Sequence, residues 1–275
     1  LWLIPHNWSI LPLWRGMGSR VSSDESQGVR WHVSMHDFVD AHNFGERVGS
    51  GVVRRMRRMQ DLIYKNATSR DVICEPMAQH LQEQTGTPPS FICRKGLDSD
   101  HFAYLESKQV YSPPSTLDPR PSTPIKLAYA GTILCEPEFA LFVNLLESII
   151  QQRTTNNEPR TPLLELHLYG AHSYASRPWF RPWIIEHGNL PENDLIVELR
   201  KCDWGLSLMA LDERDPIYNR YSFPAKFCTY FSAGLPVITI GHPESSVMKM
   251  ASAYNVGLTI QTRNPSREDL ANALF

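Results

Sequence analysis

The sequence predicts an α/β fold with doubly wound parallel sheets in two domains. From residue 125 onward, short apolar strands alternate with helices, an order typical of a parallel sheet covered on both faces. A shorter run of alternating elements occupies residues 30–93. Between the two runs, residues 111–124 hold five prolines among Ser and Thr, which indicates an exposed linker. We therefore expect a partial N-terminal domain, a linker and a C-terminal domain over residues 1–104, 105–124 and 125–275.

In the first run, residues 30–36 alternate between apolar and polar side chains, as a half-buried strand does. Residues 52–64 predict a basic amphipathic helix whose apolar face holds Val52, Met56, Met59 and Ile63. The elements that we expect after it are a strand, a helix and a strand at residues 71–74, 76–84 and 91–93.

In the second run, apolar stretches predict six strands, and longer amphipathic stretches predict four helices. The strands are expected at residues 126–130, 163–169, 184–187, 204–209, 235–240 and 256–260, and the helices at 139–149, 191–202, 224–233 and 243–254. Because ligands of doubly wound sheets bind outside the carboxyl ends of the strands, the loops at those ends are the candidates for a binding site.

Composition narrows the class of protein. A hydrophobic content of 42% suffices for a buried core, and a net charge of -2 gives no general attraction to nucleic acid. The five cysteines are scattered without a CxxC pair, which favours a reducing, cytoplasmic setting. The apolar start lacks a basic leader and is broken by Pro5 and Pro12, so we expect no signal peptide. The chain begins with Leu1, and we expect it to be cut at both ends.

The most informative segment runs from Tyr218 to Gly241. Pro224 suits the first turn of a helix and Gly234 suits its end. The amides and the dipole at such a helix start favour a phosphate, to which Lys226 would add a positive charge. An ordinary helix packed in an α/β domain fits the same spacing.

The same segment resembles the donor-binding segment of GT-B glycosyltransferases, in particular the sugar transferases called family four, or glycosyl transferases group 1. These proteins carry a Ser-Pro-x-Lys turn and then a Tyr-Leu-x-x-Gly-x-Pro-Val-Ile run. Here the turn spans residues 222–226 and the run spans residues 230–238. Weaker similarities follow in the expected order at residues 67–81, 94–102, 125–133, 166–171 and 201–209.

The resemblance implies two Rossmann-like domains of the GT-B type, of which the N-terminal, acceptor-side domain is incomplete and the C-terminal one binds the donor. It also implies transfer of a sugar from a nucleotide-diphosphate donor to an acceptor hydroxyl, without a cofactor or a metal. The acceptor would be a carbohydrate or a lipid-linked molecule. The implied donor-binding residues are Gly131, Gly170, Arg220, Ser222, Pro224, Ala225, Lys226 and Thr229. Thr229 stands where many members have a Glu that holds the ribose, and the Arg and Lys that follow the first glycine loop in the family are absent from residues 131–142.

His36 and Asp37 are the implied catalytic residues, because the family often places a histidine facing the cleft at the matching strand end. Imidazole titrates near neutral pH and could orient or deprotonate an acceptor hydroxyl. A hydrogen-bonded histidine at a strand end is the alternative. A metal site that draws on His32, His36, Asp37, Asp40 and His42 is a weaker one.

Two further questions stay open in the sequence. The basic cluster at residues 54–58 is either a solvated helix face or a peripheral contact with the inner face of a membrane. The function is either sugar transfer, epimerisation of a sugar nucleotide by a related fold, or non-catalytic binding of a nucleotide sugar. An epimerase would need acid and base carboxylates that we do not identify.

Overall fold

A computed structural model describes two compact units of the chain. The first unit holds residues 1–94, 213–223 and 244–246, and the second holds residues 95–212, 224–243 and 247–275. The described residues are 2–5, 10, 15, 30–38, 49–94, 99–100, 103, 124–154, 164–212, 216–263 and 267–274. The predicted linker lies outside them except for residue 124.

The partition differs from the expected domains, because two short segments of the C-terminal half belong to the first unit. Residues 95–104, which we expected in the N-terminal domain, fall in the second unit. The reason for the first difference lies in side-chain contacts more than a hundred positions apart, such as the hydrogen bond between Cys74 and Tyr221. Local sequence patterns carry no trace of such contacts.

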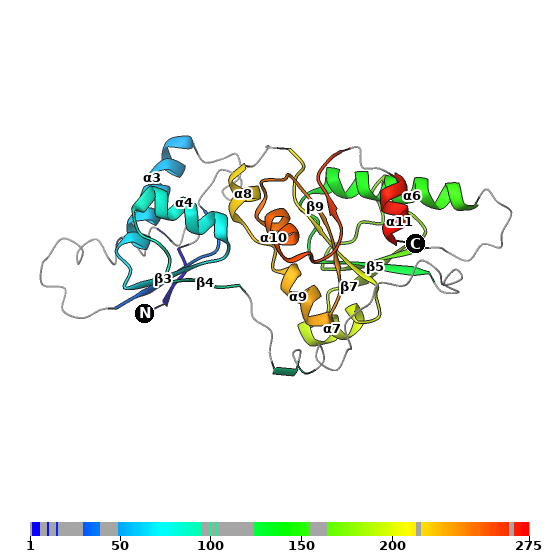
Figure 1. The fold of residues 1–275 in the computed structure, drawn as a ribbon, viewed down its shortest axis with the longest axis horizontal. Helices are drawn as coiled ribbons and strands as arrows, with labels where there is room; N and C mark the ends of the chain where they lie inside the picture. The colour runs from blue at the N-terminus through cyan, green and yellow to red at the C-terminus, as the bar shows by residue number, and fades with distance from the viewer. Residues whose placement is uncertain are drawn as a thin grey trace, which may run out of the picture. The chain divides into compact units, whose positions relative to one another are not determined.

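The first unit is built on a parallel sheet of four strands in the order β1-β2-β3-β4. The strands are β1 (Trp2–Leu3), β2 (His32–Met35), β3 (Ser69–Val72) and β4 (Phe91–Ile92). Helices α3 (Ser50–Lys65) and α4 (Glu75–Thr85) lie together beside β3 and β4 (Figure 1). The short helix α8 (Pro216–Tyr221) also packs on α4.

The buried face of α3 is turned by one residue from the predicted one at its start. Val53 is buried together with Met56, Met59 and Ile63, whereas Val52 is 47% exposed. The expectation for Val52 was therefore wrong. Either valine has a helical spacing to Met56 that places it near the apolar face. The sequence periodicity of one helix therefore does not determine which of the two is buried.

The second unit contains a parallel sheet of six strands in the order β10-β9-β8-β5-β6-β7. The strands are β5 (Ile125–Ala130), β6 (Leu164–Tyr169), β7 (Ile184–Gly188), β8 (Trp204–Leu208), β9 (Val237–Ile240) and β10 (Thr259–Ile260). The chain winds from β5 to β7 in one direction and from β8 to β10 in the other. The strand order therefore reverses between β5 and β8, which is the position where ligands of such sheets bind.

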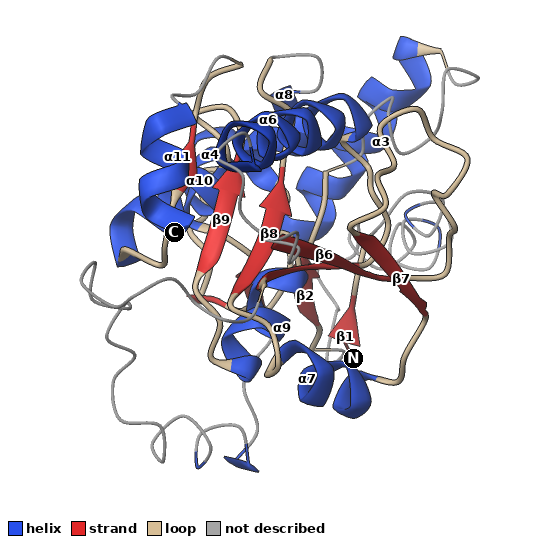
Figure 2. Ribbon diagram, turned by 90° about the vertical axis from the view of Figure 1, so that its right-hand side faces the viewer, coloured by secondary structure: helices blue, strands red, loops and turns tan. Residues whose placement is uncertain are grey.

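Helices cover both faces of this sheet, as Figure 1 and Figure 2 show. Helices α6 (Glu136–Thr154) and α11 (Arg267–Leu274) lie on one face, and α7 (Glu192–Leu199) and α9 (Lys226–Ala233) lie on the other. A further helix, α10 (Ser246–Tyr254), lies between β9 and β10 in the sequence. The predicted α/β fold with parallel, doubly wound sheets is confirmed. The elements β1, α8 and α11 were not predicted.

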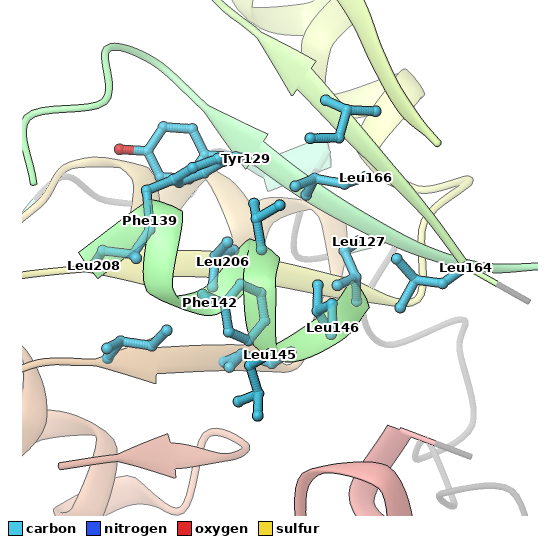
Figure 3. Close-up of a cluster of buried hydrophobic side chains, with 14 of the residues drawn as sticks. Leu127, Tyr129, Phe139, Phe142, Leu145, Leu146, Leu164, Leu166, Leu206 and Leu208 are labelled. Carbon is cyan, nitrogen blue, oxygen red and sulfur yellow. The ribbon is translucent and has the colours of Figure 1, made fainter. Parts of the chain in front are cut away.

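The core of the second unit forms where α6 packs on the centre of the sheet (Figure 3). Side chains on one face of α6 meet leucines of three neighbouring strands, and full burial of each such side chain contributes about 1.5–3 kcal/mol. The labelled members are Leu127, Tyr129, Phe139, Phe142, Leu145, Leu146, Leu164, Leu166, Leu206 and Leu208. This layer holds β5 and β8 rigidly on both sides of the point where the strand order reverses.

Candidate functional site

Two glycines meet at the carboxyl ends of β5 and β6. Gly131 has a φ of 94°, and its amide donates to the carbonyl oxygen of Tyr169 at 2.7 Å. A Cβ atom on Gly170 would lie 2.9 Å from the carbonyl oxygen of Gly131, closer than real Cβ contacts. The backbones therefore touch where a side chain would block them. These two predicted donor-binding residues therefore lie against each other at the ends of β5 and β6.

Lys226, the first residue of α9, reaches the same strand end. Its ammonium nitrogen lies 3.7 Å from the centre of the Tyr129 ring, near the carboxyl end of β5. The Tyr129 hydroxyl in turn donates to the carbonyl oxygen of Thr132 at 2.9 Å. The ammonium is thereby held beside the loop that follows β5.

The electrostatics of Lys226 are unusual for a lysine. Although the residue as a whole is half-buried, its ammonium is deeply enclosed, and this burial lowers its pKa to about 7, against a small opposing effect of Cys135. A lysine in this state gains a proton readily when an anion approaches. The arrangement suits a ligand that brings negative charge to the strand end.

Tyr230 fixes α9 against the two central strands. Its hydroxyl accepts from the amide of Ala130 at 3.0 Å and donates to the carbonyl oxygen of Leu206 at 2.9 Å. A Cβ atom on Gly205 would lie 2.6 Å from the Tyr230 ring, so only glycine leaves room for it. Tyr230 thus joins β5, β8 and α9 at the reversal of the strand order.

The start of α9 differs from the prediction. The helix begins at Lys226, and the amides of Phe227 and Cys228 donate to the carbonyl oxygens of Pro224 and Ala225, both at 3.1 Å. We expected the first-turn amides to be unpaired. Instead, the amides of Phe227 and Cys228 form the hydrogen bonds of a tight turn. Ala225 is exposed, whereas Thr229 is buried.

A second group of predicted residues lies in the first unit. His36 and Asp37 directly follow β2, and His36 is exposed whereas Asp37 is half-buried. The Asp37 carboxylate accepts a hydrogen bond from the hydroxyl of Ser222. A residue that we expected in catalysis therefore contacts one that we expected in donor binding. Arg220 lies half-buried in α8 of the same unit.

The predicted residues thus form two groups, each within one unit. In the second unit Gly131 meets Gly170, while Lys226 contacts Tyr129 of the same strand as Gly131's neighbour Ala130; in the first unit Asp37 meets Ser222. Sequence reasoning missed the contact of Tyr129 with Lys226 and the structural role of Tyr230, although both residues stand inside the segments that carry the resemblance. Among the described residues, no three His, Cys, Asp or Glu side chains are grouped to hold a metal, and Asp40 and His42 lie outside that part.

Comparison with solved structures identifies the fold. Sucrose-phosphate synthase from Thermosynechococcus elongatus is similar with a TM-score of 0.56 and 14% identity, over 96% of this chain and 61% of that one. A UDP-forming α,α-trehalose-phosphate synthase from Burkholderia xenovorans is similar with a TM-score of 0.58 and 10% identity, over 99% of this chain and 64% of that one. WaaG, a glycosyltransferase involved in lipopolysaccharide biosynthesis, is similar with a TM-score of 0.55 and 14% identity, over 95% of this chain and 70% of that one.

The chain has the GT-B glycosyltransferase fold. It spans less than two thirds of the length of the two synthases. Residues 146–272 also match the family described as the glucosyltransferase 3-like, C-terminal domain. A search among curated proteins found no match. The predicted pair of Rossmann-like GT-B domains is therefore confirmed at the level of the fold.

The family match covers part of the residues described at the strand ends, and Tyr129 and Gly131 lie outside it. The matched residues include Gly170, Lys226 and Tyr230, and they run through β8, α9 and β9. Within the described helices, none combines the length and the apolar character that crossing a bilayer requires.

Proposed function

We propose that the chain transfers a sugar from a nucleotide-diphosphate donor to an acceptor hydroxyl. The observation that carries this proposal is the position of the Lys226 ammonium over Tyr129 of β5, the strand at the reversal of the strand order that Gly131 directly follows. A cation and closely approachable backbone are what a diphosphate needs at that position. The similarity of residues 146–272 to a glucosyltransferase domain supports the same reaction.

The donor's leaving group is the nucleoside diphosphate, which gains negative charge as the sugar departs. Lys226 would neutralise this charge, and its enclosed setting strengthens the interaction because little water competes for it. Gly131 and Gly170 would let the backbone approach the phosphates or the sugar. In this proposal protein groups alone stabilise the diphosphate, and no metal is required.

The acceptor's hydroxyl would be met by His36. This side chain is exposed directly after β2, where it can accept a hydrogen bond or a proton from a hydroxyl. The proposed acceptor is a carbohydrate, either free or lipid-linked. A cytoplasmic location at the inner face of a membrane would suit the second kind.

Calorimetric titration with UDP and GDP, followed by turnover of UDP-glucose and GDP-mannose with and without added glucosides, tests this function. Release of the nucleoside diphosphate that depends on the glucoside supports transfer. Conversion of the donor into another nucleotide sugar would point to an epimerase instead. Binding without either reaction would mean a non-catalytic module, and absence of binding for both nucleotides would remove the site altogether.

We also propose that α3 is the surface that contacts a membrane. Arg54, Arg55, Arg58 and Lys65 are exposed on it, together with Val52 and Leu62, which are 47% and 42% exposed. A basic face that carries apolar side chains binds anionic bilayers through charge and shallow insertion. Sedimentation with phosphatidylglycerol vesicles should retain the wild type and lose a variant with all three arginines changed to Gln. Equal sedimentation of the two proteins would leave α3 a solvated face.

A further inference from the structure

Three consecutive residues at the end of α8, Tyr221 to Phe223, are each held by the first unit. The carbonyl oxygen of Tyr221 accepts from the thiol of Cys74 at 3.2 Å. The Tyr221 ring packs on Phe38 and His80, with ring centres 5.0 and 4.7 Å apart. Its hydroxyl lies 3.2 Å from Nδ1 of His80. Tyr221 is therefore fixed through its backbone, its ring and its hydroxyl.

Ser222 is held even more completely. Its amide donates to the carbonyl oxygen of Tyr218 at 3.0 Å, and its own carbonyl oxygen accepts from the hydroxyl of Ser246. Its hydroxyl donates to the Asp37 carboxylate. The residue is 7% exposed, so water has little access to these groups. Every polar group of Ser222 thus has a partner within the first unit.

Asp37 is itself fixed from the other side by α3. The side-chain amide of Gln60, which is fully buried, donates to the carbonyl oxygens of Asp37 at 3.0 Å and of Pro5 at 2.8 Å. A hydrogen bond to a carboxylate is about twice as strong as one between neutral groups. The bond from Ser222 to the Asp37 carboxylate is therefore expected to be stronger than the neutral hydrogen bonds that hold the same segment.

Phe223 completes the hold and leads directly into α9. The guanidinium of Arg94 lies 5.4 Å from the centre of its buried ring, and the same guanidinium pairs with Glu75 at 2.5 Å. Lys226 follows three positions later and starts α9. The first unit thus determines the course of the chain immediately before the residue that we propose to contact the diphosphate.

We infer that Asp37 is a positioning residue that acts through Ser222 to fix residues 221–223, the segment that leads along the chain into α9. The effect of Asp37 on donor binding rests on the proposed function. The effect of Asp37 on the position of residues 221–223 does not. Asp37 therefore does not exchange a proton with the acceptor, and Ser222 does not bind the donor directly. His36, which is exposed beside Asp37, is left for the acceptor chemistry.

Hydrogen exchange of the amides of residues 222–229, measured in the full chain, tests the inference. Asp37→Ala and Ser222→Ala should each speed exchange of these amides about tenfold, as expected when a link worth about 1.4 kcal/mol is lost. Asp37→Asn keeps an acceptor oxygen and should restore most of the protection. The double variant should resemble either single one, because both remove the same bond. Asp61→Ala in α3 and Ser148→Ala in α6 are the matched controls and should leave these amides unchanged.

Unchanged exchange in both single variants would overturn the inference, and so would equally fast exchange in the Asp61→Ala control. The affinity for UDP separates this outcome from a failure of the proposed function. If Asp37→Ala binds UDP more weakly than the wild type and Asp37→Asn binds it with nearly the wild-type affinity, Asp37 helps to position Lys226. Faster exchange with unaltered UDP binding would overturn the effect on the donor site. A wild type that binds neither UDP nor GDP removes the proposed function, and exchange then decides the inference alone.

Discussion

The ammonium of Lys226 lies 3.7 Å from the centre of the Tyr129 ring. This contact joins the start of α9 to the carboxyl end of the strand beside the reversal of the sheet. An ammonium over an aromatic ring keeps part of its electrostatic stabilisation after it leaves water. The ring therefore lets a lysine stay at an enclosed position, where it can serve an anionic ligand.

Replacement of Lys226 by Ala should weaken UDP binding about tenfold or more, because a charge-assisted contact contributes about 1.5–3 kcal/mol. Calorimetric titration of both proteins measures the change. Lys201→Ala, which removes an exposed lysine paired with Glu198, is the control and should bind UDP like the wild type. Equal affinity of the wild type and Lys226→Ala would exclude Lys226 from the site.

The affinity for UDP should also depend on pH through Lys226. Its pKa is about 7 in the free protein, and a bound diphosphate raises this pKa because it stabilises the charged ammonium. Between the two pKa values binding takes up a proton, so affinity should fall as pH rises above 7. In the Lys226→Arg variant the side chain stays charged at every pH, so the remaining change of affinity with pH reports the titration of UDP itself. Identical pH profiles for the two proteins would contradict this origin.

His36→Ala should lower kcat for sugar transfer by about a hundredfold while leaving UDP affinity within about twofold, since general base catalysis contributes about 10²–10⁴ in rate. Steady-state kinetics with calorimetry on the same variant separate the two effects. His36 is exposed, so its replacement should not disturb the fold. Parallel losses of UDP affinity and of kcat would argue for a structural role of His36.

Tyr230→Phe should destabilise the second unit by about 1–3 kcal/mol, because the buried amide of Ala130 and the carbonyl of Leu206 lose their shared partner. Urea denaturation measures the difference. Tyr254, which is 65% exposed, supplies the control substitution Tyr254→Phe. If Tyr230→Phe and Tyr254→Phe unfold at the same urea concentration, the hydroxyl of Tyr230 does not support the junction.

The sequence predicted the fold well where periodicity extends over a whole element. The strands from β5 to β9 each match a predicted run within two residues at either end. For β8 and β9 the reason is that buried parallel strands are nearly continuously apolar, whereas the edge strand β7 was marked only by its short apolar start. In contrast, β1 has two residues and α8 has six, which are too few to show a period. Such elements exist because of tertiary contacts that a local pattern does not contain.

The candidate site could be predicted only in part. Lys226, Gly131 and Gly170 stand in segments whose local composition marks a helix start or a strand end, so motif and spacing reached them. The bond between Asp37 and Ser222 joins residues 185 positions apart. The resemblance to GT-B glycosyltransferases implied a catalytic role for one and a donor contact for the other. Only the fold shows that the two side chains meet, and that they bind each other.

The last prediction concerns a histidine pair on the edge of the second sheet. Nδ1 of His167 on β6 lies 2.8 Å from Nε2 of His187 on β7, and the two rings stack with centres 5.0 Å apart. Nε2 of His167 lies 3.1 Å from the carboxylate of Glu165, which Lys126 also approaches at 4.0 Å. Burial lowers the pKa of His167 below its usual 6.5, with smaller contributions from Glu165, which raises it, and from His187 and Lys126, which lower it.

Because the folded pKa of His167 lies below the unfolded one, the unfolded chain binds more protons in the window below pH 6.5. Its contribution to stability is complete above pH 6.5 and is lost as pH falls through the folded pKa. The temperature midpoint of unfolding should therefore decrease when the pH is lowered from about 7.5 to about 5.5, a range that brackets the histidine pKa. His167→Gln should show a shallower fall. Burial also lowers the pKa of His80, so part of the pH dependence should remain in this variant and become smaller when His80→Gln is added. A fall as steep in His167→Gln as in the wild type would assign the pH dependence to other groups.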